Sequence, residues 1–357
     1  MPAMSAVLFF DPVCDRPYDT DTLRNQAMGG SEATVVRVAD ALGALVAQHN
    51  RTSASGRYQP PRRDPAITHV IVNRDSRALR TVRELYPNAR IHLWLHDRVR
   101  PRSKRARRLA ADAEVLRALA VKMICVSDTQ RHAVEATLRW MRVEDHVSAC
   151  TVYNPIDDEL QPDGSPVDDC KLVFLSSPNK GLRFALDAFR AVRRAMPDMR
   201  LIVGNPGYKE GDAARLDGVV YLGPQPQPRI HAEVRTALCT FFPNFVIPET
   251  FGLVFAESHA LGTPVLTHDC GAALEVLGDP AQVLPVTMAK KGYEALLGGC
   301  PTPWRRWPAR TAAVLGLFDI YVDRIRAWRA GARPVTRPDP RFALSAVTHR
   351  WHEVLTA

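Results

Sequence analysis

Short apolar runs alternate with segments of helical spacing along most of this 357-residue chain. In the first part, each strand-like run is followed by a segment whose apolar residues recur every three or four positions, which is typical of an amphipathic helix. Such alternation predicts parallel βαβ units with helices on both faces of a sheet, so we expect a doubly wound α/β domain. The expected strands are 6–10, 67–72, 91–95 and 122–126, and the expected helices are 32–46, 76–86, 106–119 and 129–141.

The alternation stops over residues 154–169, an acidic stretch with three prolines and a glycine that is typical of an interdomain linker. It then restarts and predicts a second doubly wound domain, and after Pro285 the pattern becomes helical only. The last helices either cap the second domain or cross back to the first. The expected strands are 171–175, 199–203, 219–222, 240–243 and 264–267, and the expected helices are 182–196, 229–238, 251–261, 288–297, 310–328 and 342–355.

We therefore expect an N-terminal domain over residues 1–153, a linker over 154–169, a second domain over 170–340 and a C-terminal helix over 341–357. Composition supports a globular protein, with 46% apolar and 24% charged residues. No apolar run is long enough to span a membrane and no secretory signal starts the chain. Seven scattered cysteines argue against a disulfide framework or a zinc site. We expect a cytoplasmic protein.

The formal net charge of +9 is concentrated in one place. The stretch from Arg98 to Arg108 holds seven basic residues and no acid. Three interpretations stay open: a solvated loop and helix start, a surface that meets anionic lipid headgroups, and a nucleic-acid patch. No aromatic residue that could stack on a base lies among the arginines, which weakens the third interpretation.

Two candidate binding features of the first domain lie at the ends of predicted helices or strands. Gly29 and Gly30 open a helix, where a ligand can approach the backbone and free amides attract an anion. The glycine spacing does not match a dinucleotide fingerprint, so a nicotinamide enzyme is disfavoured. His96 directly follows a strand and would face a ligand-binding edge. Capping roles for both features remain open.

The second domain carries the more specific pattern. Lys180 and Gly181 stand just before a helix, where a phosphate would meet a point charge and helix-end amides together. Glu249 precedes the next apolar helix, and Glu257 lies about two turns inside it. The two carboxylates are too far apart to straddle one glycosidic bond, and could instead hold hydroxyl groups of one extended ligand.

Together these residues resemble the retaining glycosyltransferases of family 4 (glycosyl transferases group 1), which have the GT-B fold of two facing Rossmann-like domains. The resemblance covers most of the chain and rests chiefly on the spaced glutamates and the Gly-Thr-Pro-Val sequence after them. It implies a nucleotide-sugar donor, such as a UDP- or GDP-sugar, and neither cofactor nor metal. In the implied site Glu257 holds the ribose, Glu249, His96 and Lys180 are the catalytic residues, and the donor is also bound by Gly29, Gly30, Arg183, Phe251, Gly252 and Leu253.

The implied acceptor is a glycan or lipid-linked molecule in cell-surface polysaccharide or lipopolysaccharide synthesis, reached by peripheral attachment to the inner face of the cell membrane. One departure stands out, because the loop before Lys180 lacks an arginine common in the family; Arg183 is the candidate substitute. Asp19 and Asp21 form an Asp-x-Asp that we interpret as solvated rather than metal-binding. The alternatives are a catalytically reduced nucleotide-sugar-binding protein on the same fold and a nucleic-acid-binding protein acting through Arg98 to Arg108; we expect no nucleic-acid partner.

Overall fold

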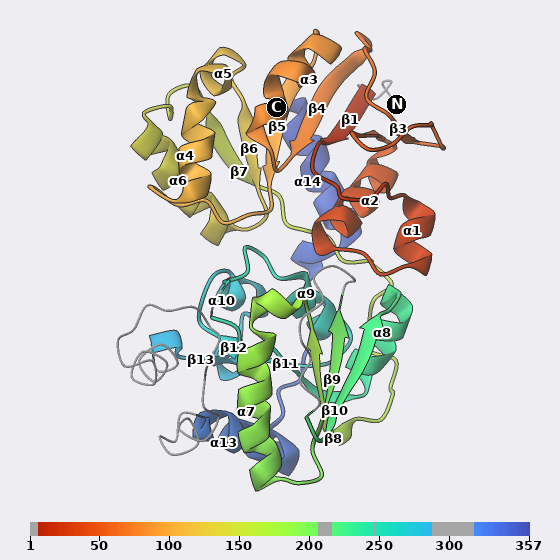
Figure 1. The fold of residues 1–357 in the computed structure, drawn as a ribbon, viewed down its shortest axis with the longest axis vertical. Helices are drawn as coiled ribbons and strands as arrows, with labels where there is room; N and C mark the ends of the chain where they lie inside the picture. The colour runs from red at the N-terminus through yellow and green to blue at the C-terminus, as the bar shows by residue number, and fades with distance from the viewer. Residues whose placement is uncertain (1–5, 206–215, 246, 288–317) are drawn as a thin grey trace. The chain divides into compact units, whose positions relative to one another are not determined.

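The computed structural model describes residues 6–205, 216–245, 247–287 and 318–357. The chain forms two compact units. The first comprises Met1–Leu23, Gly29–Asp158 and Pro340–Ala357, and the second comprises Arg24–Met28 and Glu159–Asp339. Each unit is built on one sheet with helices on its faces (Figure 1).

The described residues of the first unit form a seven-stranded sheet in the order β3-β2-β1-β4-β5-β6-β7, in which all neighbouring strands are parallel. The strand order reverses between β1 and β4, which makes the carboxyl ends of these strands a topological switch point. The strands are β1 (Ala6–Asp11), β2 (Leu45–Gln48), β3 (Tyr58–Gln59), β4 (Ile67–Asn73), β5 (Arg90–Leu95), β6 (Lys122–Cys125) and β7 (Ser148–Thr151).

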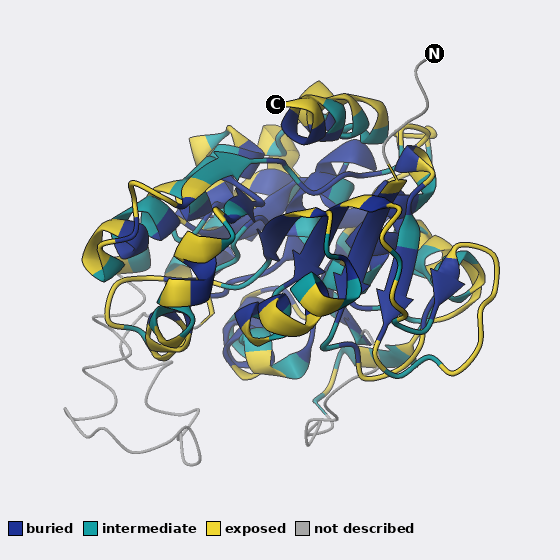
Figure 2. Ribbon diagram, turned by 90° about the horizontal axis from the view of Figure 1, so that it is seen from above, coloured by how far each residue is buried: buried dark blue, intermediate teal, exposed yellow. Residues whose placement is uncertain are grey.

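Helices cover both faces of this sheet, and Figure 2 shows buried strands beneath helices that expose only their outer sides. The C-terminal helix α14 (Leu344–Thr356) packs against α2, and its Trp351 contacts the rings of Phe9 and Trp94 on the sheet. The helices are α1 (Thr20–Asn25), α2 (Gly30–Leu42), α3 (Leu79–Leu85), α4 (Lys104–Ala111), α5 (Ala113–Ala118) and α6 (Asp128–Met141).

The second unit repeats the architecture with a six-stranded parallel sheet in the order β10-β9-β8-β11-β12-β13, so its switch point lies between β8 and β11. Its strands are β8 (Asp168–Leu175), β9 (Arg200–Asn205), β10 (Val219–Pro224), β11 (Ala237–Phe241), β12 (Val265–His268) and β13 (Val283–Leu284). Its described helices of the α type are α7 (Leu182–Ala195), α8 (Gln227–Arg235), α9 (Leu253–Ala260), α10 (Ala273–Leu277) and α13 (Asp319–Ala327).

The expected fold class of doubly wound α/β domains is confirmed, whereas several boundaries were wrong. The helix expected over 32–46 ends at Leu42, because Gly43 adopts a left-handed conformation (φ 66°) that caps it, and β2 follows. The helix expected over 106–119 is two helices that meet at Asp112. The helix expected over 229–238 ends at Arg235, before β11. The short edge strands β3 and β7 were not predicted.

The linker and the C-terminal segment also have defined places. Within the expected linker, Ile156 pairs with Ala343 and the Asp157 carboxylate binds Arg37 of α2, so this part belongs to the first unit. The segment Pro340–Ala357 belongs to the same unit. The expected helix 288–297 and residues 310–317 of the expected helix 310–328 lie outside the described residues.

Candidate functional site

The switch point of the second sheet brings together two of the predicted site residues. Lys180 lies in the loop after β8, and Glu249 lies in the loop after β11. The Lys180 ammonium Nζ donates to both carboxylate oxygens of Glu249, at 2.8 and 3.0 Å. The carboxylate is largely buried, with 12% of its side chain exposed, whereas the lysine keeps 32%. The pair therefore presents a cation and an acceptor side by side at the end of the sheet where α/β proteins bind ligands.

The loop after β8 holds Lys180 in a tight turn. Pro178 starts a single 3-10 turn that ends at Lys180, and Gly181 follows with φ 92° and immediately precedes α7. A side chain at Gly181 would meet the amide of buried Asn244, whose Oδ1 lies 3.2 Å from the position of the missing Cβ. This contact and the left-handed φ of 92° both favour glycine at position 181, where the loops after β8 and β11 meet.

A third loop, after β12, supports Glu249. The Ala272 amide donates to the carbonyl of Glu249 at 3.0 Å. A Cβ on Gly271 would come within 2.3 Å of the same carbonyl oxygen, so any other residue there would displace the Glu249 backbone. Sequence reasoning missed Asn244 and Gly271 as supports, because nothing in the local pattern says that these loops meet.

The remaining donor-site candidates lie at the start of α9. Gly252 has φ 94°, and a Cβ there would come within 2.5 Å of the Phe255 ring. Phe251 is buried, and Leu253 is the first residue of the helix. Glu257 is half-buried and lies one turn inside α9, not two turns as expected, because the helix begins at Leu253 rather than at residue 251.

Arg183 is exposed on the first turn of α7. It forms no ion pair with any described residue, so it is not part of the contact between Lys180 and Glu249. Whether Arg183 replaces the arginine that the loop lacks stays a prediction.

The other predicted residues belong to the first unit. Gly29 is buried and precedes the first residue of α2, which is exposed Gly30, and the Gly29 carbonyl accepts from the Ala33 amide. Glu32 in the same turn binds Arg74 at 3.1 Å. A helix N-terminus thus lies beside a guanidinium held at the end of β4.

His96 follows β5, as predicted, and its ring packs on Trp94 with centroids 4.5 Å apart. Burial, with a smaller contribution from the nearby Arg74 charge, lowers the pKa of His96 to about 3. The imidazole is therefore neutral at physiological pH and can accept or donate a hydrogen bond without carrying charge.

A buried polar cluster at the first switch point was also missed. Asp11, at the end of β1, is fully buried, and its carboxylate accepts from the Tyr18 hydroxyl at 2.7 Å and from the Asn73 amide at 3.0 Å. Burial and the neighbouring Asp11 raise the pKa of Tyr18 well above its usual value. These bonds satisfy a carboxylate that would otherwise be costly to bury, and they fix the loop that leads to α2.

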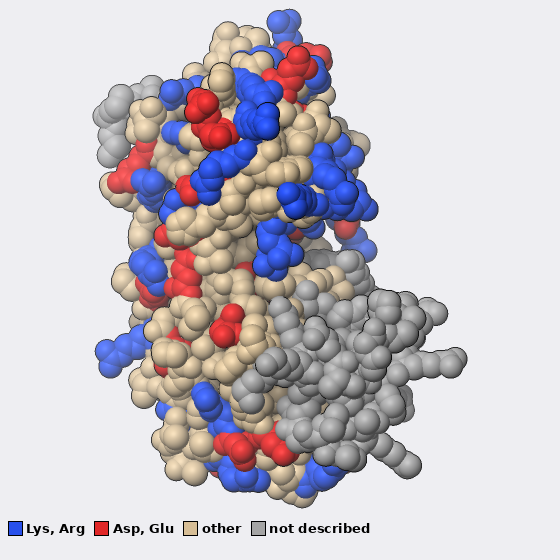
Figure 3. Space-filling view, turned by 90° about the vertical axis from the view of Figure 1, so that its left-hand side faces the viewer, with Lys and Arg blue, Asp and Glu red and all other residues tan. Residues whose placement is uncertain are grey.

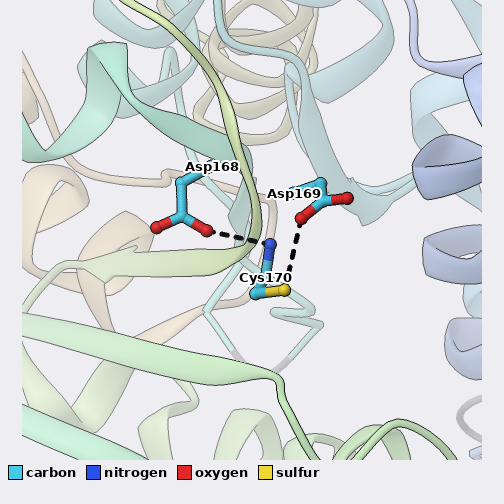
Figure 4. A group of neighbouring side chains, drawn as sticks. All are labelled: Asp168, Asp169 and Cys170. Atoms are coloured by element: carbon cyan, nitrogen blue, oxygen red, sulfur yellow. Dashed lines mark hydrogen bonds between the residues drawn. The ribbon is translucent and has the colours of Figure 1, made fainter.

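Two acidic clusters among the described residues hold carboxylates that bind other groups of the protein. Asp19 accepts from the Thr22 amide and binds Arg51 at 3.2 Å, so it caps α1. Asp168, Asp169 and Cys170 bring three potential ligand groups together at the amino end of β8 (Figure 4). There the Asp168 carboxylate pairs with Arg200 and accepts from the Cys170 amide, so it is engaged within the protein.

The chain thus belongs to the class of proteins with two doubly wound α/β domains. An ion-paired lysine and glutamate lie at the switch point of its second domain. Residues 170–297 match the family model described as glycosyl transferases group 1. Over this part of the chain, the resemblance seen in the sequence is therefore confirmed.

Proteins of similar sequence are named as glycosyltransferases or mannosyltransferases. A D-inositol 3-phosphate glycosyltransferase from Acidothermus cellulolyticus is 32% identical over 134 residues, covering 32% of this chain and 30% of that protein. A phosphatidyl-myo-inositol mannosyltransferase from Mycobacterium leprae is 33% identical over 186 residues, covering 50% of this chain and 45% of that protein. The matched part thus spans less than half the length of these relatives.

The GT-B fold class is confirmed by solved structures. HepE from Anabaena, solved in complex with UDP-glucose, matches 98% of this chain and 99% of its own, with a TM-score of 0.62 at 16% identity. A trehalose 6-phosphate synthase from Burkholderia multivorans matches 99% of this chain and 98% of its own, with a TM-score of 0.61 at 12% identity.

Proposed function

We propose that this protein is a retaining glycosyltransferase that moves a sugar from a nucleotide-sugar donor to a glycan or lipid-linked acceptor. The observation that carries the proposal is the contact between Lys180 and Glu249 at a switch point inside the matched family domain. A nucleotide sugar carries a diphosphate next to a ring of hydroxyl groups. A cation and a carboxylate within 3.0 Å of each other offer one partner to each of these groups.

In this proposal each residue has one task. The diphosphate accepts hydrogen bonds from Lys180 Nζ and from the backbone amides of Phe251, Gly252 and Leu253 at the start of α9. The sugar hydroxyls donate to Glu249, and the ribose hydroxyls donate to Glu257. As the bond between the sugar and the diphosphate breaks, negative charge grows on the leaving diphosphate, and Lys180 stabilises it more strongly than in the bound donor.

Two further features complete the proposed reaction. The sugar keeps its anomeric configuration, with the acceptor attacking from the face that the diphosphate leaves. No divalent metal is needed, because Lys180 and the amides at the start of α9 supply the positive charge. Asp19, the residue best suited to revive a metal-dependent mechanism, is bound to Arg51.

We further propose that the acceptor belongs to cell-surface polysaccharide, lipopolysaccharide or other glycoconjugate synthesis and is met at an anionic membrane surface. The support is the stretch from Arg98 to Arg108, whose seven basic residues are all exposed. Figure 3 shows Lys and Arg side chains gathered on a face of the first unit. None of the described helices has the length and apolar character needed to cross a membrane, so attachment would be peripheral.

A panel of UDP- and GDP-sugars tests the donor assignment. A ligand that binds only the folded state raises the melting temperature, by an amount equivalent to about 2.7 kcal/mol at a concentration a hundredfold above its Kd. We expect at least one nucleotide sugar to stabilise the wild-type chain and to have no such effect on Glu257→Ala. A panel in which no nucleotide sugar shifts the melting temperature would contradict the proposal.

One observation favours a second candidate, a binding protein with reduced catalysis. The loop before Lys180 lacks the family's arginine, and Arg183 forms no ion pair with Glu249. Release of nucleoside diphosphate from the stabilising donor separates the two candidates. Slow release that acceptor preparations accelerate indicates a transferase, whereas tight binding with no release indicates a binding protein.

A further inference from the structure

A cavity of about 210 Å³ lies in the first unit, at the carboxyl ends of β4 and β5. Four arginines and two aspartates line it, together with an apolar floor of Val13, Leu95, Val99 and Leu109. Its volume is several times the ~30 Å³ that one water molecule occupies in the liquid, so it can hold a small polar group and part of the molecule that carries it. The lining arginines are Arg74, Arg77, Arg105 and Arg108.

The two aspartates engage only two of these arginines. Asp97 pairs with Arg105, and Asp75 pairs with Arg77. Arg74 pairs with Glu32, which does not line the cavity, so the lining itself keeps an excess of positive charge, and Arg108 is the lining arginine without an ion pair to a described residue.

Arg74 adds a buried donor to this charge. Its Nη2 binds Glu32, but its Nε is buried and finds no hydrogen-bond partner among the described residues. Its backbone has φ 65°, a left-handed conformation that is costly for a residue with a side chain. A buried guanidinium donor without a partner is an expensive arrangement unless a ligand completes it.

We propose that this cavity binds a phosphoryl group, through the guanidinium groups of Arg74, Arg105 and Arg108. A phosphoryl group carries up to two negative charges and several acceptor oxygens, which match planar guanidinium donors better than a single carboxylate does. The apolar floor would contact the rest of the ligand. That this phosphoryl group belongs to the sugar acceptor rests on the proposed function, whereas phosphate binding at this cavity does not.

Calorimetric titration of the full chain with glycerol 3-phosphate tests the proposal, with uncharged glycerol as the blank. Arg105→Gln/Arg108→Gln removes two lining charges. Lys104→Gln/Arg107→Gln removes two charges from the same exposed helix, α4, without touching the cavity lining. Lys180→Gln reports on phosphate bound in the second unit instead. Thermal melting confirms that each variant is folded.

We expect saturable binding of glycerol 3-phosphate that weakens about tenfold or more in the Arg105/Arg108 variant. The Lys104/Arg107 variant should stay within about twofold of wild type, since it removes no group of the cavity. Weakening in Lys180→Gln without weakening in the Arg105/Arg108 variant would assign the bound phosphate to the second unit and overturn the proposal. Equal weakening in the two α4 variants would overturn the proposal, because it would show diffuse attraction rather than a site.

A second experiment shows whether the phosphoryl group comes from a soluble phosphate ester or from a lipid headgroup. The same variants are sedimented with vesicles of phosphatidylglycerol and phosphatidylcholine. Vesicle binding that falls more in the Arg105/Arg108 variant than in the Lys104/Arg107 variant assigns the phosphoryl group to a lipid, whereas glycerol 3-phosphate binding alone assigns it to a soluble ester. Binding of neither probe overturns the proposal. Donor-induced stabilisation is measured separately, so its absence would contradict the proposed function while leaving this cavity site standing.

Discussion

Lys180 and Glu249 lie 69 residues apart in the chain, yet the lysine Nζ contacts both oxygens of the glutamate. The two residues follow β8 and β11, the neighbouring strands on either side of the point where the order of the second sheet reverses. A side chain at Gly181 would meet Asn244 of the loop after β11, and a side chain at Gly271, in the loop after β12, would meet the Glu249 carbonyl. The fold itself therefore places this pair at the position where we propose that a nucleotide sugar binds.

Removing the lysine should destabilise the protein more than neutralising the glutamate. Lys180→Gln leaves a carboxylate that is only 12% exposed without its cation, whereas Glu249→Gln leaves a lysine that is 32% exposed. We expect Lys180→Gln to lower the free energy of unfolding by about 1–3 kcal/mol and Glu249→Gln by less. Denaturant titration of both single variants and the double variant measures this. If the loss of unfolding free energy in the double variant equals the sum of the losses in the two single variants, the two residues do not interact, and the prediction is contradicted.

Glycine at position 252 should be essential for the start of α9. Gly252→Ala forces a side chain into a left-handed conformation and against the Phe255 ring, so we expect a loss of about 3 kcal/mol or more in unfolding free energy. Gly278→Ala is the matched control. Gly278 has φ 63° but open space around its missing Cβ, so the same change should cost only about 1 kcal/mol there. Similar costs at the two sites would contradict the packing argument.

Glu257→Ala should remove donor affinity while leaving the protein folded. The proposal gives this half-buried carboxylate two ribose hydroxyls as partners, so its loss should weaken donor binding by about 2–4 kcal/mol. Exposed Glu144, in the first unit, provides the control variant Glu144→Ala. Calorimetric titration with the donor found in the panel is the measurement, and unchanged affinity in folded Glu257→Ala would refute the ribose assignment.

The first unit should become less stable as the pH falls, because it buries a pair of histidines. His69 Nδ1 and His92 Nε2 lie 3.3 Å apart on β4 and β5. Burial, with His69 and Lys122 nearby, lowers the pKa of His92 to about 3, and burial also lowers that of His69.

The unfolded chain takes up a proton at His92 below about pH 6.5, whereas the folded chain does not until about pH 3. Unfolding free energy should therefore decrease as the pH falls below about 6.5, by about 2 kcal/mol from this residue at about pH 5. His92→Gln should make that part of the pH profile less steep by one residue's share, because buried His96 keeps its own contribution, and the exposed His132→Gln should not change the slope. An identical slope in wild type and His92→Gln would contradict the prediction.

Attachment to an anionic membrane should depend on the exposed arginines between Arg98 and Arg108. Substituting Gln for four arginines of the stretch from Arg98 to Arg108 that do not line the cavity should abolish sedimentation with anionic vesicles, since each contributes about 1 kcal/mol near such a surface. Equal recovery in the supernatant with anionic and neutral vesicles would exclude attachment. The four are Arg98, Arg100, Arg102 and Arg107, and four exposed arginines of the second unit serve as the control: Arg194, Arg229, Arg326 and Arg337.

The alternating pattern predicted the central strands because each is a run of apolar residues buried on both faces. Three edge strands were missed, because β3 and β13 have two residues each and β7 is not apolar throughout, whereas the edge strand β10 was predicted over residues 219–222. The strand β2 was hidden inside a helix prediction, because Val46 continues the helical spacing and only the left-handed Gly43 ends α2. Local pattern thus identifies interior elements and misplaces their ends.

The candidate site was predicted as a set of residues but not as a geometry. Lys180 and Glu249 were each singled out from the residues around them, yet their ion pair depends on strand order, which no local window contains. The supports Asn244 and Gly271 were missed for the same reason. Likewise the basic stretch was visible in the sequence, whereas the cavity that Arg105 and Arg108 form with Arg74 was not.

Hydrogen exchange of the full chain, with and without the stabilising nucleotide sugar, tests the central claim most directly. Donor bound at the second switch point should slow exchange of the backbone amides in the loop from Ser176 to Gly181 and at the start of α9. Glu257→Ala should lose that protection at the same donor concentration. Donor-induced protection confined to other parts of the chain, or none at all, would contradict the placement of nucleotide-sugar binding at Lys180 and Glu249.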